Sequence, residues 1–311
     1  AFKPVTKYFD RITRPEQILQ TLPQAIQTML DPADCGPACL SLSQDVQGET
    51  YEYPEEFFKE RVHNIRRPRP DDFQIKQAAE QIKKSKNPLL ISGGGVFYSD
   101  AMEDLSNFAI KHNIPVTQTV MGYSTMKRDH SHFLGPIGGL GGKAANNLAK
   151  QTDLAIAVGT KLADFTTGSW ANFENPDFSL VSVNVSRFDA SKHLAQSVIG
   201  DAKVSLQELS NALGDWKAPD EWHKKSRDEL KNWNDYVDKE SGPTNQELPS
   251  YAHAVGAIYR NSDPTDIAVT AAGGLVGEVV QIWRPKELNT HETEWGFSCM
   301  SYEISGALGV K

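Results

Sequence analysis

Helical segments and short apolar segments alternate regularly through the middle of this 311-residue chain. An amphipathic segment at 73–84 leads into the apolar run 88–92, and a second at 102–112 precedes 115–119. The alternation continues through 144–150, 154–158, 178–185 and 204–213. Strands that are apolar throughout, separated by amphipathic helices, indicate a parallel sheet covered on both faces. The pattern therefore predicts an α/β fold in which residues 73–215 form one doubly wound, Rossmann-like domain.

The segments on either side of this domain contain too few elements to build a core. Residues 1–60 show one helical segment, 18–29, and one short strand, 38–42, so we expect the rest of their sheet to lie upstream. Residues 250–311 show a helix, a strand at 267–270, a glycine turn, a connection and an apolar helix without a partner. The predicted division is 1–60, a linker at 61–72, the sheet domain at 73–215, a helical linker at 216–249 and a further α/β unit at 250–311.

Tryptophans mark the charged segment that follows the sheet domain. Trp216, Trp222 and Trp233 lie there among Lys, Asp and Glu residues. Tryptophan in such a stretch more often anchors a helix to a domain surface than stacks on a ligand. We expect these side chains to fasten a connecting helix to the sheet domain.

The composition argues against several classes of protein. Hydrophobic residues make up 39% and charged residues 23%, as in a globular protein, and apolar runs such as 154–158 are too short to span a bilayer. A formal net charge of -8 gives no general attraction to nucleic acid, and the basic run 61–69 is interpreted as a solvated linker. Cys35, Cys39 and Cys299 make neither a disulfide framework nor a zinc site. We expect a cytoplasmic protein with no nucleic-acid or membrane partner.

Three glycine-rich stretches are candidates for ligand sites. Gly93–Gly95 lacks the G-x-G-x-x-G spacing, and no acidic residue ends the next strand at Thr119, so a tight turn is favoured over a dinucleotide site. Residues 135–142 either cradle a phosphate through backbone N–H groups or let a loop approach the sheet edge, and both interpretations stay open. The turn 271–274 lies at the carboxyl end of a strand, where such sheets bind ligands, although an ordinary βα turn is the alternative.

Histidines offer a second set of candidate residues. His130 and His132 are neighbours in a polar loop, and His291 lies beside Glu292 and Glu294. Two histidines and a carboxylate can make a metal or acid–base site, whereas loop histidines are usually just exposed. No Ser-His-Asp, H-E-x-x-H or P-loop pattern is present.

Several runs resemble the thiamine-diphosphate enzymes of the acetolactate synthase and pyruvate oxidase type. They are 36–46, 157–168, 181–186 and 199–203. In those enzymes a pyrimidine-binding domain, a central domain and a pyrophosphate-binding domain follow one another. The resemblance implies that 1–60 is the end of the first, 73–215 the central domain and 250–311 the truncated start of the third.

A closer resemblance is to the trihydroxycyclohexane-1,2-dione hydrolases of myo-inositol breakdown. The runs that carry it are 53–58, 61–68, 269–275, 282–285 and 296–300. This resemblance implies a hydrolase that opens a cyclic diketone to 5-deoxyglucuronate by carbon–carbon cleavage, with thiamine diphosphate as the electron sink. Ser301 stands where the family normally has glycine, so we expect its side chain to crowd the backbone near the cofactor.

By position, the resemblance assigns five residues to cofactor binding. Ala272, Gly273 and Gly274 would lie against the diphosphate, because their lack of bulk lets the backbone approach the anion. Ser298 would offer its main-chain carbonyl to the aminopyrimidine, and Met300 would lie beneath the bent cofactor.

The remaining parts of such a site are not expected in this chain. The resemblance implies that the ylide-forming glutamate lies upstream of Ala1 and that the Mg²⁺-binding residues lie beyond Lys311. The chain is therefore interpreted as a fragment with no catalytic or metal-binding residue of its own, and we expect it to be inactive alone. The intact enzyme would be a homodimer or tetramer acting on a small cyclic diketone.

Two other functions stay open. A flavin-dependent acetolactate synthase would hold FAD in the central domain, but Gly138–Gly141 replaces the methionine-histidine pattern and Lys161 stands where arginine is usual, which argues against FAD. A non-catalytic nucleotide-binding or scaffolding module is the other alternative. Calorimetry of residues 73–215 with NAD, ADP, FAD and thiamine diphosphate would separate these possibilities, since a scaffold gives no heat with any of them.

Overall fold

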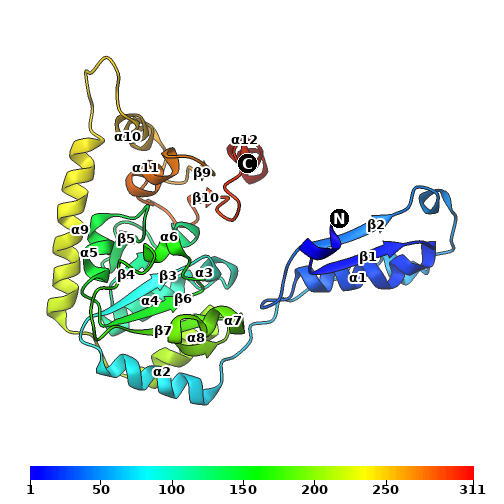
Figure 1. The fold of residues 1–311 in the computed structure, drawn as a ribbon, viewed down its shortest axis with the longest axis horizontal. Helices are drawn as coiled ribbons and strands as arrows, with labels where there is room; N and C mark the ends of the chain where they lie inside the picture. The colour runs from blue at the N-terminus through cyan, green and yellow to red at the C-terminus, as the bar shows by residue number, and fades with distance from the viewer. The chain divides into compact units, whose positions relative to one another are not determined.

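The structure, a computed structural model, describes all 311 residues as two compact units, Ala1–Pro68 and Arg69–Lys311 (Figure 1). Each unit is described by itself. The sheet domain and residues 250–311 fall into the same unit, so the boundaries predicted inside it stay predictions.

The first unit is built on one β-α-β arrangement. Strand β1 (Tyr8–Ile12) pairs in parallel with β2 (Ala38–Leu42), and α1 (Ile18–Met29) connects them. The predicted helix and strand are confirmed, but β1 was not predicted. Its five residues include the charged Asp10 and Arg11, which hide the strand pattern.

The second unit contains the predicted doubly wound sheet. Six parallel strands lie in the order β5-β4-β3-β6-β7-β8. Their bounds are β3 Pro88–Ser92, β4 Val116–Gln118, β5 Phe133–Pro136, β6 Leu154–Val158, β7 Ser179–Asn184 and β8 Gln196–Ile199. The strand order reverses between β3 and β6, so the predicted fold class is confirmed.

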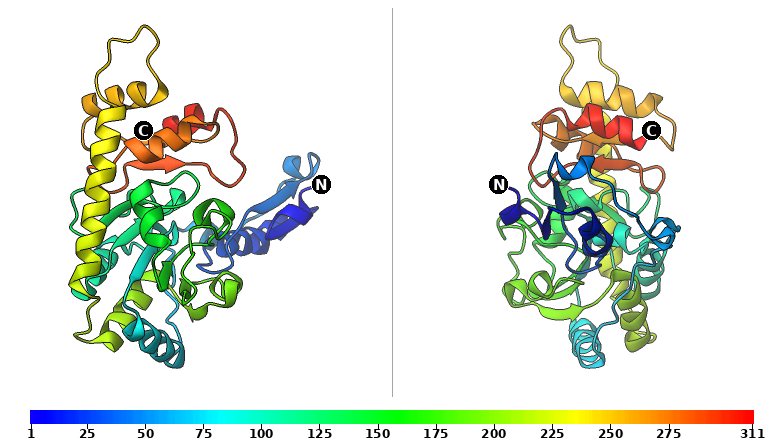
Figure 2. Two further views of the ribbon diagram at one scale, coloured as in Figure 1. Left: turned by 60° about the vertical axis from the view of Figure 1, so that its left-hand side comes forward. Right: turned by 90° about the vertical axis from the view of Figure 1, so that its right-hand side faces the viewer.

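Two groups of helices cover this sheet (Figures 1 and 2). On one side α8 (Ala202–Leu213) packs against both α2 (Asp72–Lys84) and α4 (Met102–His112). At the β5 edge, α5 (Lys143–Ala149) and α9 (Asp220–Glu240) pack together. Carboxylates of Asp71 and Asp201 accept hydrogen bonds from the first backbone N–H groups of α2 and α8, which is how these helices begin. The four-residue helices α3 Gly95–Tyr98, α6 Asp164–Thr167 and α7 Arg187–Ala190 follow β3, β6 and β7.

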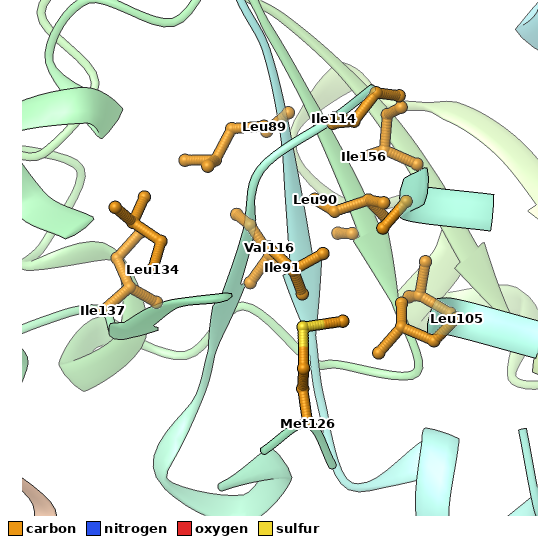
Figure 3. Packing of buried hydrophobic residues seen from close by; sticks show 14 of the residues in the cluster. Leu89, Leu90, Ile91, Leu105, Ile114, Val116, Met126, Leu134, Ile137 and Ile156 are labelled. Carbon is orange, nitrogen blue, oxygen red and sulfur yellow. The ribbon is translucent and has the colours of Figure 1, made fainter. Parts of the chain in front are cut away.

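The core of the second unit lies around β3 (Figure 3). Leu89, Leu90 and Ile91 are fully buried, because β3 is central in the sheet and helices cover both of its faces. Burying one such side chain contributes about 1.5–3 kcal/mol to folding. Continuous burial along β3 and β6 explains why their apolar runs were predicted correctly.

Helix α9 is the predicted connecting helix. Trp222 and Trp233 are buried, and Trp222 Nε1 donates a hydrogen bond to the Pro88 carbonyl at 2.8 Å. Trp216, just before α9, is partly buried beside His112. The tryptophans therefore anchor the helix, as predicted. A separate finding concerns all helices of the structure: none of them is both long enough and apolar enough to cross a bilayer.

Residues 250–311 add a small α/β segment at the carboxyl edge of the sheet. It comprises α10 Tyr251–Asn261, β9 Ala268–Thr270, α11 Leu275–Ile282, β10 His291–Thr293 and α12 Tyr302–Val310. Strands β9 and β10 are parallel, with Ala268 opposite His291. The predicted strand, turn and final helix are confirmed, and the connection between them holds α11 and β10.

Short 3-10 helices lie elsewhere in the chain, at Lys3–Val5, Pro15–Gln17, Val46–Gly48, Glu55–Phe58, Val120–Gly122 and Lys192–Leu194.

Candidate functional site

The turn between β9 and α11 presents unused backbone donors. Gly273 has φ +84°, a conformation that favours glycine, and a Cβ added to Gly273 or Gly274 would meet no atom within 4 Å. The N–H groups of these two glycines donate to no group in the chain. Open N–H groups before the first turn of a helix are suited to binding an anion.

A carboxylate stands beside this turn. The Ala272 N–H donates to Glu303 Oε1 of α12 at 3.4 Å, which connects the turn to that helix. The turn therefore has room for a diphosphate at Gly273 and Gly274, while the Ala272 N–H is already occupied. The negative charge of Glu303 would oppose an anion that arrived without a cation.

The loop between β10 and α12 is organised by Glu294. Its carboxylate accepts hydrogen bonds from the backbone N–H groups of Phe297 and Cys299, each at 2.7 Å. The Cys299 bond, followed by the Phe297 bond, holds the pKa of Glu294 below its usual value. Ser298 lies between the two donors with φ +53°, and its carbonyl accepts no hydrogen bond within the chain.

Helix α12 lies on the surface and contains no buried side chain. It begins after Ser301, whose φ is +74°. Tyr302 donates its hydroxyl to Glu292 Oε1 at 3.2 Å, and partial burial together with that carboxylate raises the pKa of Tyr302. Met300, just before the helix, is 84% exposed.

The five residues predicted to bind the cofactor thus lie on two segments joined by α12. Ala272, Gly273 and Gly274 form the turn after β9, and Ser298 and Met300 lie in the loop that enters α12. Their assignment to a cofactor stays a prediction. Sequence reasoning missed the structural roles of Glu294 and Glu303, because their partners are backbone N–H groups, which leave no side-chain pattern in the sequence.

The loop 135–142 is closed, which decides between its two interpretations. The glycine N–H groups in it donate inside the protein: Gly138 to Asn146 Oδ1, Gly139 to the Phe165 carbonyl, Gly141 to the Gly138 carbonyl and Gly142 to the Pro136 carbonyl. A Cβ on Gly138 would lie 2.0 Å from the Phe165 carbonyl oxygen. These glycines therefore serve close packing, and the interpretation as a phosphate cradle is wrong.

The glycines of the turn 93–95 also allow close packing of the backbone. Gly95 N–H donates to the Gly159 carbonyl at 2.9 Å, and a Cβ on Gly93 would lie 2.4 Å from the same oxygen. The turns after β3 and β6 therefore approach closely at the point where the strand order reverses. The prediction of a tight turn is confirmed.

His291 faces a cavity of about 250 Å³ next to the turn after β3. The cavity is lined by Gly94, Phe97, Tyr98, Val120, Met121, Ile267, Asn289, His291, Glu292, Thr293 and Val310. The imidazole is buried against the Tyr123 ring, with 5.4 Å between the ring centroids, and burial lowers the pKa of His291 to about 4. It is therefore neutral at pH 7. No group of three or more His, Cys, Asp or Glu residues in the chain is arranged to hold a metal ion.

His130 and His132 differ from the expectation of exposed loop histidines. His132 is 6% exposed, and its ring stacks on His223 of α9 with 4.2 Å between centroids. His132 Nε2 lies 3.2 Å from Asn113 Oδ1, and His130 Nε2 lies 2.8 Å from Ser106 Oγ. Burial, and then His223, lowers the pKa of His132 to about 4. These histidines join the start of α9 to the sheet domain.

Comparison with known proteins gives two findings. Residues 75–209 match the family described as thiamine pyrophosphate enzyme, central domain. The whole chain is 41% identical over 340 residues to a 3D-(3,5/4)-trihydroxycyclohexane-1,2-dione hydrolase of Clostridium tetani, covering 100% of this chain and 52% of that relative. Proteins of the same name from Clostridium perfringens and Shouchella clausii are each 39% identical, with the same coverage. The chain spans about half the length of the curated relatives it matches.

Proposed function

Because residues 75–209 belong to the thiamine pyrophosphate enzymes as their central domain, we propose that this chain is part of a hydrolase that opens the ring of 3D-(3,5/4)-trihydroxycyclohexane-1,2-dione. The observation that supports this substrate is the identity of about 40% along the whole chain to relatives that carry the name. A central domain is common to enzymes with different substrates, so it does not choose among them. The resemblance suggests 5-deoxyglucuronate as the product.

The open turn after β9 is the proposed site for the diphosphate. Gly273 and Gly274 would donate their free N–H groups to it, and the short side chain of Ala272 leaves the approach clear. Ser298 would accept a hydrogen bond from the aminopyrimidine through its free carbonyl, and the exposed side chain of Met300 would lie against the cofactor. Thiamine diphosphate, when bound, supplies the electron sink for carbon–carbon cleavage.

A divalent cation, Mg²⁺ by resemblance, would complete this site. Its charge would offset both the diphosphate and the nearby carboxylate of Glu303. We propose that its ligands, and the glutamate that activates the cofactor, are not among these 311 residues, since the chain spans about half the length of its relatives. We further propose a cytoplasmic homodimer or homotetramer.

A hybrid enzyme tests the proposal. The matching half of the C. tetani relative is replaced by this chain, and the hybrid is incubated with the cyclic diketone, thiamine diphosphate and Mg²⁺. We expect a ring-opened acid to appear by NMR, and no turnover by the 311-residue chain alone. Ring opening by the chain alone would refute the interpretation as a fragment. A hybrid that converts pyruvate but not the diketone would favour a carboligase of the acetolactate synthase type.

The flavin-dependent alternative has less support. A flavin nucleotide carries phosphates that need donors, and the glycine N–H groups at 138, 139, 141 and 142 already have partners within the protein. A colourless purified hybrid would agree with this, whereas a yellow one would revive the alternative.

A further inference from the structure

We propose that Glu294 is a positioning residue, whose carboxylate sets the conformation of the loop that presents Ser298 to the cofactor. The inference rests on the proposed function, because it assumes that thiamine diphosphate binds beside this loop. It goes beyond that function in giving a role to a residue that contacts only the chain itself.

Burial holds only the start of this loop, where Trp295 packs against the Phe165 ring and a small buried cluster that includes Val276, and it does not hold residues 296–301. Phe297 is 90% exposed and Met300 is 84% exposed, and no side chain of α12 is buried. Burial of apolar surface is the main force that fixes most protein segments, and here it is largely missing. Polar contacts must therefore define the conformation of the loop after Trp295.

The backbone of the loop needs such contacts. Ser298 and Ser301 both have positive φ, at +53° and +74°, although neither is glycine. A non-glycine residue keeps this conformation only when its surroundings impose it. The Cys299 N–H that bonds to Glu294 belongs to the same peptide unit as the Ser298 carbonyl, so this bond restrains that carbonyl directly. The Phe297 N–H bond restrains the peptide unit that precedes Phe297.

The hydrogen bonds of the Glu294 carboxylate are all made within this loop. The carboxylate forms no salt bridge, and hydrogen bonds from Cys299 and Phe297 lower its pKa, so it is ionised at neutral pH. Hydrogen bonds to an ionised acceptor are stronger than neutral ones. The Cys299 thiol also faces this carboxylate. Glu294 therefore accepts the N–H groups on both sides of Ser298 and leaves the Ser298 carbonyl unbonded.

The test compares Glu294→Gln with Glu247→Gln. Glutamine keeps one acceptor oxygen and replaces the other by an NH₂ group, which cannot accept a hydrogen bond from a backbone N–H. Glu247 is exposed and forms no hydrogen bond, so its substitution removes the same charge without touching the loop. The readouts are amide exchange by NMR, alkylation of Cys299 relative to the exposed Cys35, and thiamine diphosphate affinity by calorimetry of the hybrid enzyme with Mg²⁺.

In Glu294→Gln we expect amide exchange at Phe297 and Cys299 to rise at least threefold and Cys299 alkylation to rise several-fold. Thiamine diphosphate affinity should fall about tenfold, while the thermal midpoint stays the same. In the wild type, the two amide resonances should titrate together with a midpoint below that of an ordinary glutamate, and this titration should vanish in the variant. Glu247→Gln should match the wild type in every readout.

The possible failures are distinct. Unchanged exchange and alkylation in Glu294→Gln would overturn the positioning role. Faster exchange with unchanged cofactor affinity would overturn the connection between this loop and the cofactor. If the hybrid with the wild-type sequence of this chain shows no saturable binding of thiamine diphosphate in the presence of Mg²⁺, the proposed cofactor turn is wrong, and the exchange data still decide whether Glu294 orders the loop.

Discussion

Two glycine turns at carboxyl ends of strands have opposite character. In the loop 135–142 after β5, each glycine N–H from Gly138 onward donates to a group inside the protein. In the turn 271–274 after β9, the N–H groups of Gly273 and Gly274 have no partner. The turn with fewer glycines is the open one. The number of glycines therefore does not identify a ligand site, whereas unused donors do.

The difference arises from what surrounds each turn. The closed loop lies among Asn146, Phe165 and Trp233, which come from three other elements. The open turn follows a strand in a sheet of only two strands, and Glu303 of α12 is the one side chain that forms a hydrogen bond with it. Glycine permits close packing in the first case and leaves backbone exposed in the second.

The largest expected effect is on the closed loop. Gly138→Ala forces a Cβ against the Phe165 carbonyl at a residue with φ +105°, so we expect a loss of about 3 kcal/mol in the free energy of unfolding. Urea denaturation measures this loss. Gly139→Ala is the control, because its Cβ meets its nearest atom at 3.8 Å and should cost less than about 1 kcal/mol. Equal losses in both variants would break the comparison.

The next effect concerns His291, on the strand that pairs with β9 just before the open turn. His291 has a pKa of about 4 in the folded protein because it is buried, against 6.5 in the unfolded chain. Between these values the unfolded chain binds the additional proton, so stability is lost as the pH falls from 6.5 and the loss is complete below 4. At pH 5 the loss is about 2 kcal/mol.

The measurement is the change in unfolding free energy between pH 7 and pH 5. His291→Gln should reduce that change by about 2 kcal/mol, whereas the exposed His63→Gln should leave it as in the wild type. A pH dependence in His291→Gln equal to that of the wild type would mean that this imidazole can be protonated without unfolding, and that it is less firmly buried than the structure shows.

A smaller effect should separate the two turns by ligand binding. Gly274 has φ -68° and open space around it, so Gly274→Ala should change stability by less than about 1 kcal/mol. The added methyl group enters the space proposed for the diphosphate, and we expect thiamine diphosphate affinity to fall about tenfold or more, roughly 1.4 kcal/mol. Calorimetry and thermal unfolding together measure both quantities, with Gly139→Ala as the variant whose affinity should not change. Unchanged affinity in Gly274→Ala would count against this turn as the binding site.

The smallest expected effect is at the start of α12. Ser301 has φ +74°, so Ser301→Gly should relieve strain and stabilise the protein by about 1 kcal/mol. Ser305→Gly, inside the same helix, should instead destabilise it by roughly 0.5–1 kcal/mol. Thermal unfolding of the two variants checks the opposite signs, and a loss of stability in both would mean that Ser301 is not strained.

Ser301 also shows what the sequence could predict. The resemblance led us to expect crowding by its side chain near the cofactor, which stays a prediction, whereas the positive φ of Ser301 was not predicted. Strands β3 and β6 were predictable because their apolar runs are continuous, whereas β8 was missed because Gln196 and Ser197 interrupt its pattern. Burial of His132 was not predictable from its own loop, because the covering residue, His223, comes from α9 much later in the chain.

The length of α9 has a geometric consequence for the open turn. Near its start, His223 donates to the Ser131 carbonyl just before β5, and near its end Asp238 pairs with Arg284 after α11. The 21 residues between Asp220 and Glu240 span roughly 30 Å, enough to carry the chain from the amino edge of the sheet to its carboxyl edge. The length of α9 thus fixes the distance between these two points of attachment. Removing one turn would shorten this span by about 5.4 Å, while direct bonds such as Arg128 N–H to the Pro285 carbonyl would still hold residues 250–311 to the sheet domain. The two attachments of α9 could then no longer both be kept.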